Sequence, residues 1–345
     1  MVTVRTEPTF SILTTAYRTE AYVGETVESV LKQTRTDWEM IVVDNGMSDD
    51  MASIVRHYTT DPRIRLIRQV NRGIGGGVDA AAAAARGSYF SVLNSDDLLR
   101  PDFCQRMGEI LAAEPDVDAI GCDACIFDEE ANVLTGTHQA SIGFPDAHPA
   151  GHYLTLTEAL TGRIPYYTGA IRREAWRAVG GYQSDTTDID ESIMLWLRLL
   201  EAGYQVRTFP DRLCLFRRRA DSQSHDPQLV EEFESRIERT YTLVARRSSS
   251  LEHREAVQCA LRNVRYYQAL RRARSSLLMG DTVAARSAAK VALHQRRTLR
   301  AALVVAALAV APRMVRRIHP TKQRATAVVQ RIAARTSDGQ STGSR

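Results

Sequence analysis

The sequence predicts an α/β fold in which a mostly parallel sheet is flanked by helices, followed by an α-helical extension. Over the first 130 residues, short apolar and β-branched runs alternate with helical patterns, as the crossovers between parallel strands require. Polar turns follow two of these runs, and the chain after residue 226 is helical and rich in arginine. The 345 residues suffice for two domains. We therefore place the α/β domain at 1–226, the helical extension at 227–335 and a disordered tail at 336–345.

The periodicity of the apolar residues gives the elements in order. Strands are expected at 10–15, 40–43, 64–67, 89–93 and 119–127, with two short ones at 204–209 and 213–217. Helices are expected at 22–31, 75–86, 101–113 and 192–202. Glycines at 73 and 75–77 lie before or at the start of the second helix, and their spacing does not fit a dinucleotide-binding fingerprint. Parallel sheets bind ligands at the carboxyl ends of their strands, so the residues that follow each strand are the candidates for function.

The net charge of +4 conceals an uneven distribution of charge. From Leu251 onward there are 19 basic and 4 acidic residues, whereas the preceding part has 26 basic and 37 acidic residues. The basic C-terminal part predicts an anionic partner such as a membrane surface. The longest charge-free apolar run, Ala301 to Pro312, has 12 residues and is too short to span a bilayer. With five cysteines and no apolar signal sequence at its start, the chain is expected in the cytoplasm.

Two polar turns contain the candidate chemistry. Asp44 opens the turn Asp-Asn-Gly after the second strand, and Asp96 lies in the turn Asn-Ser-Asp-Asp after the fourth. Hard divalent cations prefer such carboxylate oxygens. Each turn also has a simpler interpretation. Asp44 can form an Asx turn, and the second turn is a good helix-start signature before Pro101.

Several motifs in a fixed order resemble one family. They are SILTTAY at 11–17, ESVLKQT at 28–34, WEMIVVDNG at 38–46, NRG at 71–73, ARGSY at 85–89, LNSDD at 93–97, RREA at 172–175, VGGY at 179–182 and LWLRL at 195–199. Over residues 9–220 the chain is similar to a family 2 glycosyltransferase with the GT-A fold. The resemblance implies inverting transfer of a sugar from a nucleotide-diphospho-sugar to a hydroxyl group in cell-envelope polysaccharide synthesis. A non-catalytic nucleotide-sugar-binding or scaffold protein of the same fold is the alternative, because two family aspartates are replaced.

The resemblance also implies a donor site that uses Mg²⁺ or Mn²⁺. Asp96 is the expected metal ligand, with Asp97 beside it and Asn94 at the position of the family's first aspartate. The implied donor-binding residues are Thr15, Ala16, Tyr17, Asp44, Arg72, Asn94, Ser95, Asp96 and Arg219. Asp44 is expected to bind the base. Arg219 stands where family members carry a histidine and would pair with phosphate.

The general base is expected in a run of carboxylates before the helix at 192–202. Aligned on LWLRL, Glu191 falls on the family's glutamate and Ser192 on the usual catalytic aspartate. Serine cannot act as a carboxylate base, so Glu191 is the first candidate, followed by Asp190 and Asp188. Charges that complement the helix dipole are the simpler interpretation of this run.

The C-terminal extension matches none of these motifs. Its segment 299–310 is apolar on all sides and is bracketed by Arg296, Arg297, Arg300, Arg313, Arg316 and Arg317. Such a helix can lie at a membrane interface with its arginines at anionic headgroups. A buried packing helix or a homodimer contact is the alternative, and nucleic acid is not expected as a partner. The expectation is a peripheral protein at the inner face of the cell membrane that acts on a glycan or lipid-linked acceptor.

Overall fold

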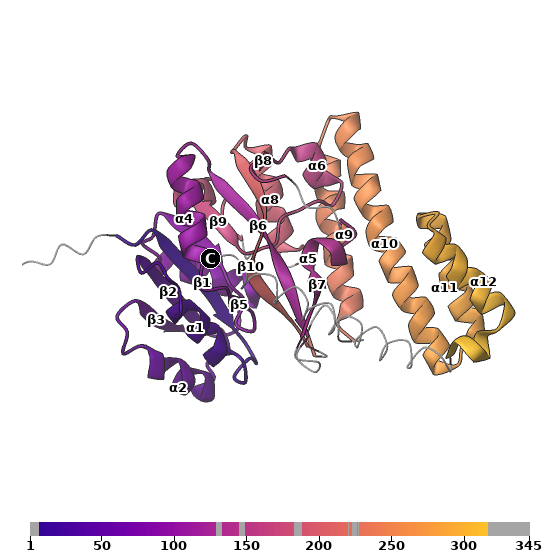
Figure 1. The fold of residues 1–345 in the computed structure, drawn as a ribbon, viewed down its shortest axis with the longest axis horizontal. Helices are drawn as coiled ribbons and strands as arrows, with labels where there is room; N and C mark the ends of the chain where they lie inside the picture. The colour runs from indigo at the N-terminus through magenta and orange to yellow at the C-terminus, as the bar shows by residue number, and fades with distance from the viewer. Residues whose placement is uncertain are drawn as a thin grey trace, which may run out of the picture. The chain divides into compact units, whose positions relative to one another are not determined.

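The structure is a computed structural model that describes residues 7–128, 133–144, 149–182, 188–219, 221–222, 226 and 228–316. The chain divides into two compact units (Figure 1). The first unit holds most of the chain up to Arg217, and the second holds the chain from Arg218 onward. The domain bounds of 1–226 and 227–335 stay predictions, and the predicted tail at 336–345 lies outside the described residues.

The first unit is built on a mixed β-sheet. Four strands run parallel in the order β3-β2-β1-β4, with β1 at Phe10–Ala16, β2 at Trp38–Asp44, β3 at Ile64–Arg68 and β4 at Tyr89–Val92. The sheet continues through β9 (Gly169–Arg172), β6 (Ala119–Asp128), β10 (Val206–Arg218) and β5 (Leu98–Leu99), with β7 (Val133–Thr137) beside β6 and β8 (His152–Tyr153) beside β10. β9 is antiparallel to β4 and β6, and β10 is antiparallel to β5 and β8. The predicted α/β class is confirmed, while the second half of the sheet contains antiparallel pairs.

The helices of the first unit connect these strands (Figure 1). They are α1 (Val23–Leu31), α2 (Asp49–Tyr58), α3 (Gly73–Ala84), α4 (Phe103–Ala113), α5 (His138–Ser141), α6 (Leu156–Leu160), α7 (Arg173–Ala178) and α8 (Glu191–Glu201). The four predicted helices correspond to α1, α3, α4 and α8. Helix α2 was not predicted. It begins where the Ser48 hydroxyl accepts a hydrogen bond from the backbone N–H of Met51, which is an N-cap that the sequence does contain.

The two short strands predicted at 204–209 and 213–217 are one continuous strand, β10. Pro210 interrupts the sequence pattern because proline lacks the N–H group that a strand ladder uses. In the structure Pro210 lies between the residues of β10 that pair with β8 and those that pair with β5. The missing donor therefore falls between these two ladders, and the strand continues through it.

The central strands β1 and β2 are buried along nearly all of their length, which explains their continuous apolar sequences. Phe10, Trp38 and Phe103 are among the largest fully buried side chains. Helix α3 packs against β1 and β2. This approach depends on Gly77, because a Cβ atom there would lie 2.2 Å from Oγ1 of Thr15. Helix packing, and not a cofactor motif, thus explains this member of the glycine run.

The second unit contains the helices α9 (Val230–Arg247), α10 (Leu251–Met279), α11 (Thr282–Gln295) and α12 (Leu299–Val310). Helix α10 contacts α9 and α11, and α11 contacts α12. Glutamates of α9 pair with arginines of α10: Glu234 lies 2.6 Å from Arg271, and Glu238 lies 3.0 Å from Arg265. Part of the basic excess after Leu251 is therefore neutralised by acidic residues that precede it. Among the described residues, no helix is both long enough and apolar enough to cross a membrane.

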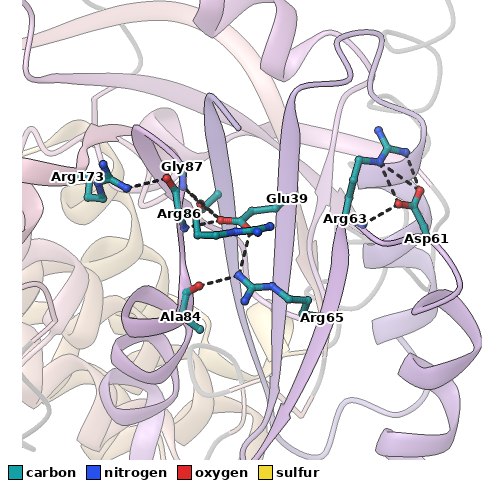
Figure 2. A network of polar contacts seen from close by, with 9 residues as sticks. Glu39, Asp61, Arg63, Arg65, Ala84, Arg86, Gly87 and Arg173 are labelled. Carbon is teal, nitrogen blue, oxygen red and sulfur yellow. Dashed lines mark hydrogen bonds and ion pairs between the residues drawn. The ribbon is translucent and has the colours of Figure 1, made fainter. Parts of the chain in front are cut away.

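A buried carboxylate ties β1, β2, β3 and the turn before β4 together (Figure 2). Glu39 of β2 is 1% exposed. It accepts hydrogen bonds from Ser11 Oγ at 2.8 Å, from Arg65 Nη2 at 2.9 Å and from Arg86 Nη2 at 3.0 Å. The backbone N–H groups of Arg86 and Gly87 also donate to it. Burial by itself would raise the pKa of Glu39, but these hydrogen bonds and the charge of Arg65 bring the pKa below its ordinary value.

Removing this carboxylate should destabilise the first unit. We expect Glu39→Ala to lower the free energy of unfolding by about 3 kcal/mol, because two guanidinium groups and two backbone donors lose their shared acceptor. Glu109→Ala, which breaks a more exposed ion pair with Arg106, should cost less than about 1 kcal/mol. Urea unfolding measures both variants, and equal costs would contradict the importance of the network.

The same carboxylate should also make stability depend on acid pH. Because the folded pKa of Glu39 lies below its ordinary value of 4.5, the contribution is complete above that value. It is lost as the pH falls through the folded pKa. The unmodified protein should therefore lose more stability than Glu39→Ala between about pH 5 and about pH 3.

Candidate functional site

The parallel register brings the polar turns to one edge of the sheet. Ala16 at the end of β1 pairs with Asp44 at the end of β2, and Leu13 of β1 pairs with Val92 at the end of β4. The loop after β1, the end of β2 and the turn after β4 therefore leave the sheet at its carboxyl edge, where α/β proteins bind ligands. The structure thus brings most of the predicted donor-site residues together, while their roles stay predictions.

Asp44 already has partners within the protein. Its side chain is 1% exposed, Oδ2 accepts a hydrogen bond from Arg68 Nε at 2.9 Å, and Oδ1 accepts one from the backbone N–H of Ser48 at 3.1 Å. Arg68 also reaches Asp49 at 2.9 Å. Asp44 therefore connects the end of β2 to β3 and to the start of α2. A nucleotide base at Asp44 would have to share the carboxylate with Arg68.

Asn45, next to Asp44, organises the loop that carries Arg72. Its side chain is 1% exposed. Nδ2 donates to the carbonyl oxygen of Gly73 at 2.8 Å and to Oδ1 of Asn71 at 3.3 Å. Oδ1 accepts from the backbone N–H of Arg72 at 3.2 Å and from Gln69 Nε2 at 2.8 Å. An aspartate could not make the two donations, so asparagine is the residue suited to this loop.

The loop after β1 presents an aromatic ring at the same edge. Tyr17 is 42% exposed. Its ring lies against Gly46, where a Cβ atom would come within 2.9 Å of it. Ala16 is buried, and Oγ1 of Thr15 is buried without a hydrogen-bond partner among the described residues. The accessible ring of Tyr17 fits a planar ligand, whereas the hydroxyl of Thr15 faces Gly77 of α3.

The turn after β4 keeps two of its side chains partly accessible. Asn94 and Asp96 are half-buried, whereas Ser95 is buried and its hydroxyl lies 2.7 Å from the hydroxyl of Thr19. The turn closes through a hydrogen bond of 3.1 Å from the backbone N–H of Asp97 to the carbonyl oxygen of Asn94. Asn94 and Asp96 are therefore the two side chains of this turn that a ligand can reach.

Asp97, the neighbour of the predicted metal ligand, is buried and engaged on both oxygens. Oδ2 accepts hydrogen bonds from the hydroxyls of Tyr166, at 2.9 Å, and Tyr167, and Oδ1 accepts from the backbone N–H of Arg217 at 2.7 Å. Burial, followed by the charge of Asp96, raises the pKa of Asp97 to about 7. The role of Asp97 as a metal ligand stays a prediction, and these contacts would compete with it. They give Asp97 a structural role that joins the turn to the segment before β9 and to β10.

Arg217 supports the turn from inside the protein, and it was not singled out from the sequence. Its side chain is 3% exposed and pairs with Glu25 of α1 at 2.5 Å. Nε donates to the backbone carbonyl oxygen of Asp96 at 2.8 Å, and the guanidinium lies 5.1 Å from the ring centroid of Tyr22. Arg217 therefore fixes the backbone of the residue that is expected to bind metal. In the sequence it is the first of three consecutive arginines, and nothing in that run marks it as buried.

The three candidate bases lie at the start of α8 in different environments. Asp188 is exposed, whereas Glu191 is 8% exposed. Asp190 is the N-cap of the helix, because its Oδ1 accepts from the backbone N–H of Ile193 at 3.0 Å and from the hydroxyl of Ser192 at 2.6 Å. The simpler interpretation, that this run completes the helix start, therefore applies to Asp190. The role of a base stays a prediction for all three.

The motifs VGGY at 179–182 and LWLRL at 195–199 are joined by hydrogen bonds. Arg198 of α8 donates to the carbonyl oxygens of Val179 at 3.0 Å and Gly181 at 2.6 Å. Gly181 has a φ of +57°, and a Cβ atom there would come within 2.5 Å of an indole nitrogen, so only glycine fits. The backbone N–H of Tyr182 donates to Asp79 of α3 at 3.2 Å. These contacts fix the turn that precedes the carboxylate run.

His138 of α5 packs against Tyr166, the tyrosine that binds Asp97. It has no role in the sequence interpretation. Its ring lies 5.1 Å from the ring of Tyr166. Burial lowers the pKa of His138, although the charges of Asp123 and Asp190 act in the opposite direction. The imidazole is therefore neutral near pH 7. Its position in an irregular segment of the sequence gave no signal of this environment.

The kind and number of possible ligand atoms determine which metal ion the site suits. No group of three or more His, Cys, Asp or Glu side chains among the described residues is arranged to hold a metal ion. The turn after β4 offers one accessible carboxylate, Asp96, and the amide oxygen of Asn94. This sparse oxygen set fits Mg²⁺ or Mn²⁺, since such ions are commonly held by one or two carboxylates while substrate phosphates and water complete the coordination.

Arg219 belongs to the second unit, unlike the other predicted donor-site residues. Its side chain is 9% exposed, and Nε lies 3.1 Å from Oδ1 of Asp221. This ion pair gives Arg219 a partner within its own unit. Its predicted contact with donor phosphates stays a prediction.

Comparisons with known proteins give the same family as the motifs. Residues 11–175 match the family described as Glycosyl transferase family 2. The chondroitin synthase of Escherichia coli is 32% identical over 208 residues, which cover 58% of this chain and 28% of that protein. The putative glycosyltransferase EpsE of Bacillus subtilis is 28% identical over 221 residues, which cover 63% of this chain and 75% of that protein. The matches span about a third or less of the E. coli protein and of B. subtilis EpsH and EpsJ.

Solved structures share the fold. The first 349 residues of S. aureus TarS superpose with a TM-score of 0.57 at 15% identity, covering 91% of each chain. A mannosyltransferase from Pyrobaculum calidifontis, solved with GDP-Man and Mn²⁺, gives a TM-score of 0.54 at 18% identity and covers 95% of this chain and 87% of its own. Identities this low concern the fold alone. Residues 11–175 are thus similar to glycosyl transferase family 2, and the chain shares the fold of these solved GT-A transferases.

Proposed function

We propose that this chain is an inverting, metal-dependent glycosyltransferase that moves a sugar from a nucleotide-diphospho-sugar to a hydroxyl of a glycan or lipid-linked acceptor. The observation that carries the proposal is the shared edge of β2, β1 and β4, where Tyr17, Asp44 and the turn 94–96 lie together. A neighbour solved with UDP-GlcNAc and one solved with GDP-Man and Mn²⁺ support the donor class. Relatives named chondroitin synthase and hyaluronan synthase support polysaccharide synthesis. We place this synthesis in the cell envelope, at the inner face of the cell membrane.

The donor would lie along the carboxyl edge of the sheet. Tyr17 and Asp44 would contact the base, and Asp96 with Asn94 would hold Mg²⁺ or Mn²⁺ beside the diphosphate. When bound, such a cation neutralises the charge that develops on the leaving diphosphate. Arg72, which is exposed at the start of α3, would pair with a phosphate oxygen. Arg217 would keep the backbone of Asp96 in place from inside the protein.

The transfer step needs one group to take a proton. A carboxylate at the start of α8 would accept the proton of the acceptor hydroxyl while that oxygen attacks the anomeric carbon. The bond between this carbon and the diphosphate oxygen breaks, its electron pair leaves with the nucleoside diphosphate, and the configuration inverts. Glu191 is the first candidate because Asp190 already caps the helix. Asp190 and then the exposed Asp188 follow.

One observation favours a second candidate function. Ser192 stands at the position of the family's catalytic aspartate, and its hydroxyl donates to Asp190 at 2.6 Å. A non-catalytic protein that binds nucleotide-sugars would tolerate this serine. That alternative predicts donor binding without turnover, whereas the transferase proposal predicts release of the nucleoside diphosphate. A screen of nucleotide-sugars with Mg²⁺ or Mn²⁺ separates the two.

The metal assignment predicts different effects for two adjacent aspartates. Asp96→Asn should lower turnover by at least about 100-fold and raise the metal concentration required, because the site loses its accessible carboxylate. Asp97→Asn is the matched comparison. Because Asp97 is 1% exposed and holds the turn, this variant should raise the metal concentration required far less than Asp96→Asn does. Nucleoside diphosphate release at increasing metal concentration measures both. Unchanged metal dependence in Asp96→Asn would refute the assignment.

The base assignment predicts a loss of rate without a loss of donor affinity. Glu191→Gln should lower the turnover number by about 10²–10⁴ while the donor Kd stays the same. Asp190→Asn keeps a good N-cap and so tests the charge of Asp190 apart from its capping role. Asp188→Asn completes the series. If all three variants retain full turnover, this run does not supply the base.

The hydrogen bonds of Asn45 predict the effect of replacing its amide with a carboxylate. Asn45→Asp should destabilise the protein by about 1–3 kcal/mol, because its carboxylate would face the carbonyl oxygen of Gly73 and Oδ1 of Asn71 without donating to either. Thermal unfolding with and without donor measures this loss and the accompanying loss of donor affinity. Asp50→Asn makes the reverse exchange at an exposed position and should cost less than about 0.5 kcal/mol. An Asn45→Asp protein as stable as this control would mean that the loop does not need the amide.

A further inference from the structure

Helix α12 is apolar on two opposite faces, and one of them is exposed. Ala301 and Leu308 are buried in clusters with residues of α10 and α11. On the other side, Leu299, Leu303 and Val310 are 76%, 60% and 86% exposed. Spacings of four and seven residues place these three side chains on one face of the helix. We call Leu299, Leu303 and Val310 the apolar stripe. A helix that faces only water would carry polar residues there, so the stripe indicates a surface made to be covered.

The stripe continues at the turn between α10 and α11. Arg286 of α11 donates to two carbonyl oxygens in the last turn of α12, at 2.8 and 3.2 Å, so the end of α12 lies beside the start of α11. Met279 and Val283, at the turn between α10 and α11, are 76% and 77% exposed, and Met314 after α12 is 59% exposed. We call Met279, Val283, Val310 and Met314 the apolar tip. Large apolar side chains are thus gathered at one end of the helical unit.

Basic residues outnumber acidic ones around the same surface. The sequence has no acidic residue from 282 to 316, and Asp281 caps α11 at the turn itself. Arg300, Arg313 and Arg316 are exposed. A Cβ atom at Gly280 would lie 3.0 Å from Nη1 of Arg316, which places this guanidinium at the turn between α10 and α11. The arginines of α10 that face α9 are paired with glutamates, whereas the arginines at this end stand beside apolar side chains.

We propose that the apolar tip and stripe insert into the interface of an anionic lipid bilayer. Leu303 and Val310 would enter the boundary between headgroups and acyl chains, and Arg300 and Arg313 would pair with lipid phosphates. A second copy of this chain is the weaker occupant, because two such surfaces would bring like-charged arginines together. Nucleic acid would bind the arginines and leave the apolar side chains in water. The inference is independent of the proposed transferase activity.

Co-sedimentation of the full-length chain with liposomes tests the inference without donor or acceptor. We expect binding to vesicles with about 30% phosphatidylglycerol, and little binding to pure phosphatidylcholine. The double variant Leu303→Gln, Val310→Gln should weaken binding by about 100-fold, roughly ten-fold for each side chain. The double variant Arg300→Gln, Arg313→Gln should weaken binding by about 30-fold and reduce its salt dependence.

Leu251→Gln is the matched control. Leu251 is 70% exposed at the start of α10, about 40 Å along the helix from the apolar tip, and this variant should bind as the unmodified chain does. All the substituted side chains are exposed, so thermal unfolding should be unchanged, which confirms that loss of binding is not loss of fold.

Three results would overturn the inference. The first is full-length protein that stays in the supernatant with anionic vesicles at low salt. The second is vesicle binding that survives the double variant at Leu303 and Val310, because charge alone would then be sufficient. The third is dimerisation that this variant abolishes in a chain that does not bind vesicles, which would assign the surface to a second copy. Nucleoside diphosphate release is measured separately, so none of these results bears on the transferase proposal.

Discussion

The pairing of β1 with β2 on one side and β4 on the other is the constraint on which the site depends. A slip of one residue would turn every side chain of a strand to the opposite face. β2 is buried on both faces, so its apolar side chains alone do not distinguish one register from the next. Glu39 does, because its buried carboxylate meets its donors from Ser11, Arg65, Arg86 and Gly87 only in the observed register. A polar group at one end of the strand thereby fixes the position of Asp44 at the other end.

A second buried carboxylate, that of Asp97, stabilises the turn that follows β4. Asp97 accepts hydrogen bonds from the backbone N–H of Arg217 and from the hydroxyl of Tyr166, whereas the adjacent Asp96 is half-buried. Of these two neighbouring aspartates, Asp97 holds the turn, and Asp96 is the one that we propose binds a ligand. Such a turn is preorganised, so binding a cation and a diphosphate there need not order the backbone first.

The sequence was sufficient for the fold class and for the polar turns that follow β2 and β4, because continuous apolar runs and the polar turns after them are local signals. It was insufficient for Asp97 and Arg217, which meet across 120 positions of the chain. Polar residues at that separation carry no periodicity, and only the folded sheet brings them together. Counting charges in the sequence likewise could not reveal that Glu234 pairs with Arg271 and Glu238 with Arg265, because these pairs form only when α9 and α10 pack together.

The amide that holds the loop at Arg72 also bears on how this protein ages. Asn45 is followed by Gly46. In this arrangement the next backbone nitrogen most easily attacks the side-chain carbonyl and expels ammonia, and water then opens the cyclic imide to aspartate or isoaspartate. In this fold the attack is opposed, because four hydrogen bonds hold the Asn45 amide and the side chain cannot rotate without breaking them. A molecule that opens locally would lose this protection and be converted irreversibly. The slow appearance of a more acidic form during storage would then report how often the loop that carries Arg72 opens.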